Sequence, residues 1–379
     1  MNKVRLGDIC RITMGQSPDS STYNDDGIGV PFYQGNADFG KLHPTAVHWC
    51  TEPKKTAEKG DILISVRAPI GALNIANEHC CIGRGLASIT VNEDVAERDY
   101  IWYLLKSKDS YLQSKGTGST FKAINKNVLF ELPVDLPSKN EQKSISDLLS
   151  KSFELATRYN IQLIKLDELI KSRFVEMFGD PVHNRMNWNT KPLAEMCKVI
   201  VDCPHSTPNY TSSNTGYMCI RTSIVKKNRI MWDKIEYISK DEYYQRIQRK
   251  KPEKGDIIYT REGAILGIAA IIDRDCSVAL GQRSMLLSPD RSLCTPEFLS
   301  VAMNFETFLN QALNGISGSA SPHINVGDVK LFQMIQPPIN KQQEYSTFVT
   351  RIEQQKATVQ QSIDKLETLK KSLMQEYFG

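Results

Sequence analysis

The sequence lacks the motifs that mark nucleotide-hydrolysing and zinc-binding enzymes. It has no Gly-x-x-x-x-Gly-Lys-[Ser/Thr] segment, so the common phosphate-binding loop is excluded. It has nine cysteines but no Cys-x-x-Cys pair, and zinc sites need ligands in pairs at short regular spacing. An odd number of cysteines in a chain that starts without a signal-peptide pattern predicts reduced thiols. We therefore expect no metal site, no cofactor and no catalytic residues.

Long apolar runs and a strong excess of one charge are also missing. No run is long enough to span a membrane, so we expect a cytoplasmic protein. The hydrophobic fraction of 40% and the mean hydropathy of −0.36 are typical of a folded, soluble chain. The formal net charge is only +4, which permits nucleic-acid binding without demonstrating it. At 379 residues, the chain is long enough for at least two domains.

The sequence does contain an internal repeat with an offset near 200 residues. Residues 166–179 match residues 366–379, with seven of 14 positions identical. Shorter matches follow the same order in both halves: 6–10 with 193–197, 58–62 with 253–257, 118–119 with 318–319, 124–125 with 324–325, and 137–142 with 338–343. Chance does not produce an ordered series of this kind, so the chain is predicted to hold two copies of one structural unit.

Each copy has a mixed α/β part followed by a long helix. Residues 60–67 and 255–261 begin with Gly-Asp and continue with β-branched and apolar residues, which predicts a turn and a strand. Residues 99–106 and 296–303 have the pattern of short helices. The segments 140–177 and 344–378 contain neither proline nor glycine, which predicts uninterrupted helices. The predicted fold class is mixed α+β, with α/β domains at 1–139 and 180–339 and long helices at 140–179 and 340–379.

Apolar residues recur along both predicted helices at steps of three and four, or at sums of these steps. They are Ile145, Leu148, Leu155, Tyr159, Leu166 and Leu169 in the first helix, and Tyr345, Phe348, Ile352, Val359, Leu366, Leu369 and Leu373 in the second. The pattern favours a coiled coil with polar breaks; the alternative is that each helix lies only on its own domain. A helix of about 35 residues is roughly 50 Å long, which is longer than a small domain is wide. We therefore expect the two helices to pack on each other.

The doubled features resemble the specificity (S) subunit of type I restriction–modification systems. They are the Gly-Asp-Ile segments at 60–62 and 255–257, the Pro-x-x-x-[Glu/Gln]-Gln segments at 137–142 and 338–343, and the long helices that end in Phe178-Gly179 and Phe378-Gly379. No single motif is specific, but the set covers nearly the whole chain. One departure is Gln342 where the first copy has Glu141, and both residues are expected to serve the first turn of a helix.

The resemblance implies a non-catalytic protein with two target-recognition domains in tandem, each followed by a long helix. The two helices would pack as an antiparallel coiled coil with pseudo-two-fold symmetry. The expected partners are double-stranded DNA, two methyltransferase subunits and, through them, restriction subunits. The assembled complex would carry DNA adenine methyltransferase and ATP-dependent endonuclease activity, and its target would be bipartite and asymmetric. No membrane association is expected.

Two other functions remain open from the sequence. The chain could instead be the specificity subunit of a fused methylase–nuclease, which would keep the same two recognition domains. It could also be a stand-alone enzyme such as a nuclease, which would need activity without partner subunits.

Base recognition in DNA needs Arg, Lys, Asn, Gln, Ser or similar polar side chains on loops held by a rigid frame. The candidates are Gln34, Asn36, Arg67, Arg84, Ser119 and Lys122 in the first domain, and Arg221, Thr222, Arg261, Arg283, Ser319 and His323 in the second. The alternative for each is an ordinary surface residue. Residues near the ends of the long helices are candidates for binding the methyltransferase: Phe174, Met177, Met374 and Tyr377.

Overall fold

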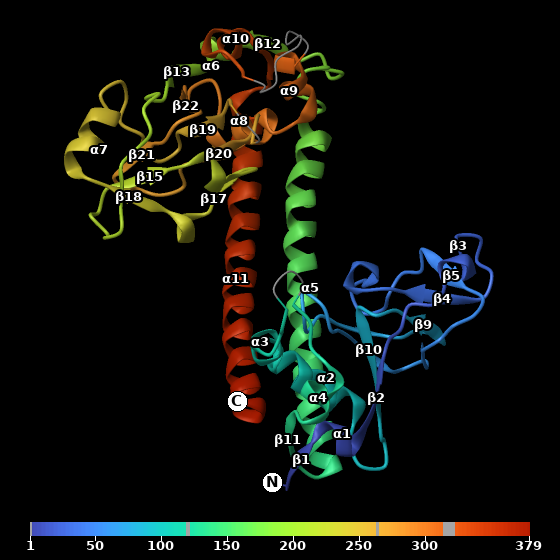
Figure 1. Cartoon of the computed structure of the whole chain (residues 1–379). Helices are drawn as coiled ribbons and strands as arrows, with labels where there is room; N and C mark the ends of the chain where they lie inside the picture. Colours follow the sequence, from blue (N-terminus) through green and yellow to red (C-terminus); the bar gives the residue numbers. More distant parts are fainter. Residues whose placement is uncertain (1, 119–121, 263–264, 314–322) are drawn as a thin grey trace. The chain divides into compact units, whose positions relative to one another are not determined.

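The computed structural model describes residues 2–118, 122–262, 265–313 and 323–379, which form two compact units. Unit 1 comprises Met1–Asn160 together with Gln361–Gly379, and unit 2 comprises Ile161–Gln360. Each unit therefore contains one mixed α/β domain and part of both long helices, α5 (Lys139–Phe178) and α11 (Ile339–Phe378) (Figure 1). The mixed α/β class and the long helix after each domain, both predicted from the sequence, are confirmed.

The domain of unit 1 is built mainly from short strands. Its elements are β1 (Asn2–Arg5), α1 (Leu6–Ile9), β2 (Cys10–Met14), η1 (Ser20–Thr22), β3 (Tyr23–Asn24), β4 (Val30–Tyr33), η2 (Asn36–Asp38), β5 (His48–Cys50), β6 (Thr56–Ala57), β7 (Ile62–Ser65), β8 (Leu73–Ile75), β9 (Cys80–Ile82), β10 (Leu86–Val91), α2 (Arg98–Ser107), α3 (Asp109–Ser114), α4 (Lys126–Phe130) and β11 (Pro133–Leu136).

The domain of unit 2 has a matching series of elements. They are β12 (Asn189–Pro192), α6 (Leu193–Met196), β13 (Cys197–Asp202), β14 (Tyr210–Thr211), β15 (Met218–Ile220), η3 (Thr222–Ile224), β16 (Val225–Lys226), β17 (Arg229–Ile230), η4 (Trp232–Lys234), β18 (Glu236–Ile238), α7 (Lys240–Arg246), β19 (Ile257–Thr260), β20 (Ala269–Ile271), β21 (Val278–Leu280), β22 (Ser284–Pro289), α8 (Pro296–Met303), α9 (Glu306–Leu313), α10 (Val326–Leu331) and β23 (Gln333–Gln336).

The sheets of the two domains follow the same strand order, apart from the additional strand β6 in unit 1 and the separate β16-β17 pair in unit 2. The four-stranded sheet runs β2-β10-β7-β8 in unit 1 and β13-β22-β19-β20 in unit 2. An antiparallel pair stands at the boundary of each domain, β1 with β11 and β12 with β23, immediately before the long helix begins. The second sheet runs β3-β5-β4-β9-β6 in unit 1 and β14-β18-β15-β21 in unit 2, and each contains one parallel pair, β4 with β9 and β15 with β21. The sequence repeat is therefore a repeat of structure.

The Gly-Asp segments form the predicted turns before a central strand. Gly60 and Gly255 have φ values of 94° and 90°, a left-handed conformation that glycine adopts without a steric penalty. The next residue is a buried aspartate whose carboxylate closes the turn: Asp61 Oδ2 accepts from the Glu58 amide at 3.0 Å, and Asp256 Oδ2 accepts from the Glu253 amide at 2.9 Å. The strands β7 and β19 follow directly, so the same five-residue signal positions the same strand in both domains.

The core of unit 1 is completed by both long helices. Ile62 and Ile64 of β7 are buried together with Leu149 of α5 and with Leu373 and Phe378 of α11. The N-terminal part of α5 and the C-terminal part of α11 thus belong to one apolar cluster. Burial of this kind contributes on the order of 25 cal/mol for each Å² of apolar surface, which is why the helices cannot be separated from the domain without cost.

The core of unit 2 combines the opposite parts of the same helices. Phe174 and Phe178 of α5 pack against Phe298 of α8 and Tyr345 of α11, with ring centroids 5.3 Å apart for Phe174 and Phe298 and 5.5 Å apart for Phe178 and Tyr345. The Tyr345 hydroxyl donates to the Ile170 carbonyl at 3.1 Å. Here the C-terminal part of α5 meets the N-terminal part of α11.

The buried face of α5 differs from the predicted apolar stripe. Leu148, Leu155 and Leu169 are exposed, whereas Leu149 and Ile170, each next to a predicted residue, are buried. The prediction was therefore wrong at three of its six positions, where the buried side chain is one residue further on, a rotation of roughly 100° about the helix axis. The other three, Ile145, Tyr159 and Leu166, are half-buried. In α11 most of the predicted stripe is buried (Tyr345, Ile352, Val359, Leu366 and Leu373), and Leu369 is exposed.

A buried glutamine ties each long helix to its domain. Gln142 Oε1 accepts from the Glu97 amide at 2.8 Å, and its Nε2 donates to the Pro137 carbonyl at 2.9 Å. Gln342 repeats this arrangement at an offset of 200 residues, with the Thr295 amide at 3.1 Å and the Pro337 carbonyl at 2.8 Å.

This geometry corrects the alignment of the two proline-containing segments. Gln142 is equivalent to Gln342, not to Gln343, because only Gln342 makes the same pair of bonds. Glu141 has its own function, since its carboxylate accepts from the Ser138 amide at 2.9 Å as the cap of α5. Hydrogen bonds from Ser138 also lower the pKa of Glu141. Glu141 and Gln342 both lie in the first turn of a helix, as expected, but they are not equivalent residues.

Candidate nucleic-acid interface

Backbone hydrogen bonds join four loop segments of unit 1 into one edge of the domain. The Gly85 amide donates to the Gln34 carbonyl at 3.1 Å, and the Val66 amide donates to the Gly85 carbonyl at 2.9 Å. The Ile124 amide then donates to the Val66 carbonyl at 2.9 Å. We call this surface loop edge 1 and define it as residues 34–36, 66–68, 83–85 and 122–124. It stands just beyond the C-terminal ends of β4, β7 and β9, where the sheet holds the loops rigidly.

Loop edge 1 brings together most of the first-domain candidates. The side chains of Gln34, Arg67, Arg84 and Lys122 are all exposed on it. Asn36 is half-buried at the start of η2. The Asp38 carboxylate fixes this segment by accepting from the Gln34 amide at 2.7 Å. Ser119 lies outside the described residues.

Unit 2 has a corresponding edge, in which the bond from the Gly281 amide matches the one from the Gly83 amide to the Tyr33 carbonyl in unit 1, also at 2.8 Å. The Gly281 amide donates to the Ile220 carbonyl at 2.8 Å, the Arg261 amide to the Arg283 carbonyl at 3.0 Å, and the Ile324 amide to the Arg261 carbonyl at 2.9 Å. We call this surface loop edge 2 and define it as residues 220–222, 261–262, 281–283 and 323–324.

The second-domain candidates have different exposures on loop edge 2. Arg221, Arg283 and His323 are exposed, and Thr222 is half-buried at the start of η3. Arg283 adopts a φ of 65°, which is uncommon for a residue other than glycine, asparagine or aspartate. Its equivalent in unit 1 is Gly85, because both carbonyls accept the matching strand-end amide. Ser319 lies outside the described residues.

Arg261 is the candidate that the structure contradicts as a direct base contact. Its side chain is only 2% exposed, and its guanidinium is held by carboxylates on two sides. The Asp202 carboxylate accepts from Nε and Nη2, both at 3.0 Å, and Glu262 Oε1 lies 3.0 Å from Nη1. A buried, paired guanidinium cannot leave its partners to reach a base without leaving those carboxylates uncompensated.

Glu262 was not among the candidates, although it occupies in the second domain the position that Arg67 occupies in the first. Val66 and Arg261 make the same two backbone bonds, so Arg67 is equivalent to Glu262. The bridges of Arg67 with Ala123 and of Glu262 with His323 support this assignment. Asp61 and Asp256 are equivalent in the repeat, and Arg67 and Glu262 each follow six residues later. This spacing would have given the pairing of Arg67 with Glu262 directly.

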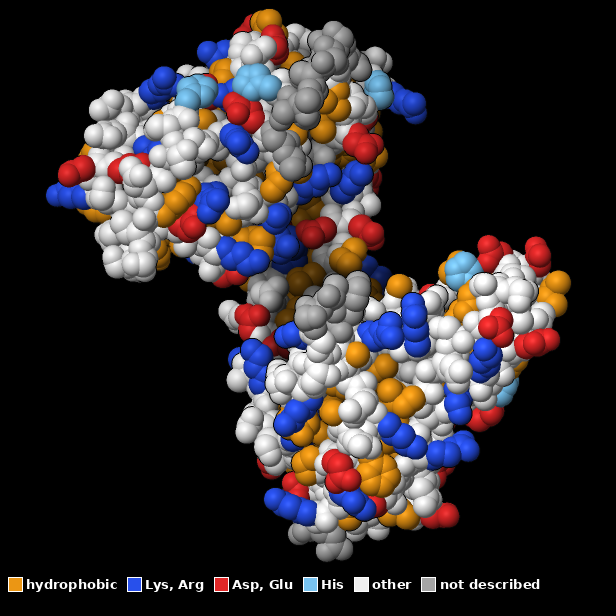
Figure 2. Space-filling view, viewed as in Figure 1, with side chains coloured by type: hydrophobic (Ala, Val, Ile, Leu, Met, Phe, Trp, Pro, Cys, Tyr) orange, Lys and Arg blue, Asp and Glu red, His pale blue; other side chains and the backbone are white. Residues whose placement is uncertain are grey.

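The two edges also differ in how their cations are held. In unit 2, Arg221 pairs with Glu236 at 3.0 Å and lies over the Tyr210 ring, 5.2 Å from its centroid, and the bond to Glu236 raises the pKa of Arg221. For Arg67 and Arg84 the described part of the chain shows no ion pair. On the face in Figure 2, Lys and Arg side chains are interspersed with acidic and hydrophobic ones over both units, in keeping with the small net charge.

Of the four candidates for partner binding, one is buried in a core and the other three are half-buried against the cores. Phe174 is completely buried in unit 2, so the prediction that it contacts a partner is wrong. Met177 packs against the same cluster, and Met374 and Tyr377 pack against the core of unit 1. These residues were selected for their place near the ends of the long helices, and for Met177, Met374 and Tyr377 the partner contact stays a prediction.

Other apolar side chains of α5 are exposed. At 100° per residue they divide between two sides of the helix, with Leu148, Leu155 and Leu169 on one side and Ile161, Ile164 and Val175 nearly opposite. We call the second set, which lies within unit 2, the α5 apolar face. Ile164 is the most open of them, at 58% exposed. At an offset of 200, α11 has polar residues at all three positions of this face: Gln361, Asp364 and Gln375. The α5 apolar face is therefore a feature of one helix and not of the repeat.

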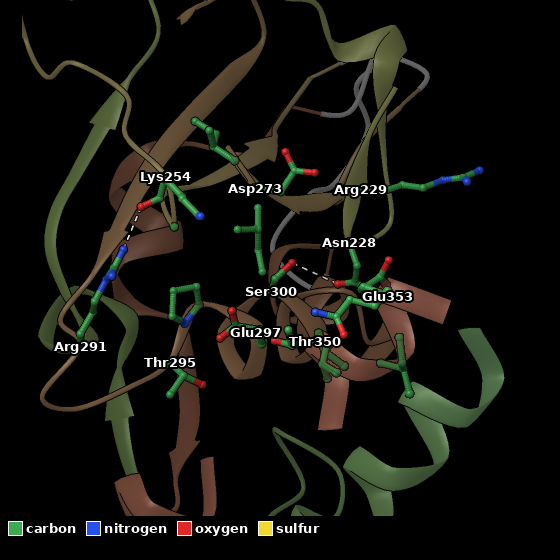
Figure 3. Close-up of a pocket in the computed structure, with 18 of the residues that line it drawn as sticks. Asn228, Arg229, Lys254, Asp273, Arg291, Thr295, Glu297, Ser300, Thr350 and Glu353 are labelled. Atoms are coloured by element: carbon green, nitrogen blue, oxygen red, sulfur yellow. Dashed lines mark hydrogen bonds between the residues drawn. The ribbon is translucent and has the colours of Figure 1, made fainter. Parts of the chain in front are cut away.

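A cleft of about 890 Å³ lies in unit 2 between the α/β domain and α11 (Figure 3). Ser300 and Asn228 meet across its wall with their side-chain oxygens 3.0 Å apart, and the Arg291 guanidinium donates to the Lys254 carbonyl at 2.8 Å. Thr350 contributes from α11. Lys254 precedes β19, whereas loop edge 2 follows its end, so the cleft is separate from the candidate DNA interface.

The thiols and carboxylates give no sign of metal or redox chemistry within the described ranges. All nine cysteines are free, and eight of them are buried. Burial raises the pKa of Cys80 and Cys294 to about 12, which leaves the thiols protonated at neutral pH. In the part of the chain that the structure covers, no group of three or more His, Cys, Asp or Glu residues is arranged to hold a metal ion. The same residues contain no helix of the length and apolarity that a membrane crossing needs.

Comparison with known proteins identifies the family. The chain matches the family described as "Type I restriction modification DNA specificity domain" over residues 1–165 and 186–368. It is 45% identical over 148 residues to a Methanocaldococcus jannaschii protein provisionally named as the type I restriction enzyme MjaX specificity subunit. That match spans 38% of this chain and 35% of the relative, so it covers only about a third of the relative's length.

Two further similarities extend over nearly the whole chain. The MjaVIII type I restriction enzyme specificity subunit of the same organism is 22% identical over 399 residues, which is 98% of this chain and 90% of the relative. The crystal structure of the type I restriction–modification S subunit from M. genitalium has a TM-score of 0.59 at 15% identity, covering 100% of this chain and 96% of that one, and so has the same fold. Since the family match includes most of both units, this chain belongs to the type I restriction–modification DNA specificity domain family.

Proposed function

We propose that this chain is the sequence-specific DNA-binding subunit of a type I restriction–modification complex. The observation that supports the proposal is the doubling of one loop edge: two domains with the same topology present exposed polar side chains at the same place. Residues 1–139 and 180–339 would be the two target-recognition domains, and 140–179 and 340–379 the helices that connect and space them.

The two loop edges would recognise unlike half-sites, which makes the DNA target asymmetric. Gln34 is equivalent to Arg221, and Arg67 to Glu262, so the hydrogen-bonding groups differ at matched positions. Major-groove edges of the four base pairs differ in donors and acceptors, and unlike side chains therefore select unlike bases. We further propose that α5 and α11 pack as an antiparallel coiled coil that sets the number of unread bases between the half-sites.

The α5 apolar face would bind the methyltransferase subunits. Exposed isoleucine and valine side chains on a helix are typical anchors for a second amphipathic helix. We propose two methyltransferases per chain, with restriction subunits joining through them. Because α11 carries Gln361 and Asp364 where α5 carries Ile161 and Ile164, the two docking sites would not be identical.

The chain itself would be non-catalytic and would act in the cytoplasm, where its DNA substrate lies. The assembled complex would supply DNA adenine methylation and ATP-dependent cleavage. The second candidate function, service to a fused methylase–nuclease, uses the same two loop edges and differs only in the partner.

The test is to map DNA methylation in cells that contain this system with and without the chain. Methylation of one bipartite, asymmetric sequence that depends on the chain would support the proposal. The purified chain should neither cut nor methylate DNA when supplied with Mg²⁺ and S-adenosylmethionine. Activity of the chain alone would instead identify a stand-alone enzyme and contradict the proposal. Native mass measurement of the complex gives the number of methyltransferases.

A further inference from the structure

The two loop edges differ most in the side chains that support them from below. Met14 at the end of β2 is equivalent to Asp202 at the end of β13, since each pairs with the second residue of the neighbouring strand, β10 or β22. Val66 is likewise equivalent to Arg261. Unit 1 therefore has two apolar side chains where unit 2 has an aspartate and an arginine.

In unit 2 these residues form a continuous polar network that reaches the surface. The buried Arg261 guanidinium contacts Asp202 on one side and Glu262 on the other, at 2.9 Å and 3.0 Å. His205 Nε2 lies 3.0 Å from the Asp202 carboxylate, and His323 Nδ1 lies 3.1 Å from Glu262 Oε1. His205 and His323 are exposed, whereas Arg261 is buried.

The contacts of Arg261 point to one tautomer of the neutral His323 ring. Arg261 Nη1 lies 3.1 Å from His323 Nε2, and a guanidinium can only donate, so Nε2 accepts. The ring hydrogen of this tautomer is on Nδ1, which lies 3.1 Å from Glu262 Oε1. Glu262 Oε1 is therefore close to both the Arg261 guanidinium, at 3.0 Å, and the His323 ring. The Glu262 side chain stays a quarter exposed.

We propose that Glu262 is a specificity-determining residue that selects cytosine at one position of the half-site bound by unit 2, and that Arg261 is the positioning residue that holds it. The inference rests on the proposed function. A carboxylate accepts hydrogen bonds and cannot donate them, and among the base edges of the major groove the cytosine N4 amino group is the donor that Glu and Asp contact. The equivalent residue in unit 1, Arg67, can only donate, and arginine contacts guanine O6 and N7.

The Arg261 guanidinium explains how the Glu262 carboxylate can lie on a surface that contacts DNA. Phosphates repel an isolated anion, and the repulsion would push an unsupported glutamate away from the groove. Arg261 lies directly behind Glu262 and neutralises part of its charge, while Asp202 prevents the guanidinium from moving outward. Unit 1 needs no such support because Arg67 is itself attracted to DNA, and Met14 and Val66 fill the same space.

The experiment measures base preference in the complex assembled with its methyltransferase subunits, using a library of targets randomised at both half-sites. The variants are Glu262→Gln, Arg261→Lys and, as a matched control, Glu253→Gln. Glu253 is an exposed carboxylate at the other end of β19, so its replacement changes the charge equally without touching loop edge 2.

The wild-type complex should prefer cytosine at one position of the unit 2 half-site by about fivefold or more, the lower range for a specific base contact. Glu262→Gln should remove this preference and leave every other position of both half-sites unchanged. Arg261→Lys keeps the positive charge but loses the two-pronged contact with Asp202, so it should weaken the preference at the same position. A variant with both Arg261→Lys and Glu262→Gln should lose no more base preference than Glu262→Gln alone, because both changes act on one contact.

The unit 1 half-site serves as an internal measure of folding, since its preferences should persist in every variant. A retained cytosine preference in Glu262→Gln, or an equal loss in Glu253→Gln, would overturn the assignment of Glu262 while leaving the proposed function intact. Loss of preference at all positions of the unit 2 half-site in Glu262→Gln would assign the residue a structural role and would also overturn it. A wild-type complex without any sequence preference would refute the proposed function itself.

Discussion

Replacement of Gln342 by alanine tests how the long helices are attached to the domains. The Gln342 amide is completely buried and makes three hydrogen bonds, with the Thr295 amide at 3.1 Å and with the carbonyls of Pro337 and Leu293 at 2.8 and 3.1 Å. Alanine leaves one buried N–H and two buried carbonyls without these partners. Each unsatisfied buried group costs about 1–3 kcal/mol, so with partial access of water we expect a loss of about 2–4 kcal/mol of unfolding free energy.

The neighbouring residue provides a matched control. Gln343 is exposed on the same turn of α11, and its replacement by alanine should change the unfolding free energy by less than about 0.5 kcal/mol. Urea unfolding of the full chain, followed by far-ultraviolet circular dichroism, measures both variants. The Gln142→Ala variant should behave like Gln342→Ala, because its bonds are the same. An effect of Gln343→Ala as large as that of Gln342→Ala would refute the alignment of the repeat at an offset of 200.

Four further outcomes follow from the exposure or burial of particular side chains. Ile164→Asp on the α5 apolar face should abolish methyltransferase binding in a pull-down while the circular dichroism spectrum stays unchanged; Phe174→Asp should unfold unit 2, because it buries an unpaired charge. Normal assembly of Ile164→Asp would exclude this face as the docking site. Arg84→Ala should weaken binding to the specific target by about 1–3 kcal/mol without altering affinity for unrelated DNA, as measured by fluorescence anisotropy. Iodoacetamide at pH 8 should modify Cys276 first and should spare Cys80, whose pKa is raised by burial to about 12; mass spectrometry of the native protein would show any early reaction at Cys80.

The repeat allowed most of the fold to be predicted from the sequence. The Gly-Asp segments specify a left-handed glycine and a capping carboxylate, and this local chemistry is sufficient to place β7 and β19. The long helices could be predicted equally well, because a long run without proline or glycine has few alternative structures. Local signals of this kind do not depend on which residues of the rest of the chain pack against the strand or helix.

The buried side of α5 could not be derived in the same way. Leu148 and Leu149 are adjacent, as are Leu169 and Ile170, so stripes through either member have the same spacing of three and four. Only the shape of the domains beside the helix decides which member is buried. The choice of Phe174 as a partner contact was wrong for the same reason.

The structure brings most of the first-domain candidates together on one group of loops, but the sequence did not show which of the candidate side chains are exposed. Gln34, Arg84 and Lys122 are exposed on one edge because backbone hydrogen bonds far apart in the sequence join their loops. Arg261 was chosen for its charge. A guanidinium can contact DNA at the surface, but it can also be buried and hold a neighbouring side chain in place. That distinction depends on Asp202, which lies 59 residues away in the sequence and carries no motif.

The division of each core between distant segments has a consequence for synthesis of the protein on the ribosome. When residues 1–160 have emerged, the first domain still lacks Leu373 and Phe378, and the Phe378 carbonyl that accepts from Lys108 is more than 200 codons away. The core of the nascent first domain therefore stays incomplete until residues 373–378 have been synthesised. A stop codon before residue 361, or a protease that removes residues 361–379, would damage the domain that is encoded first.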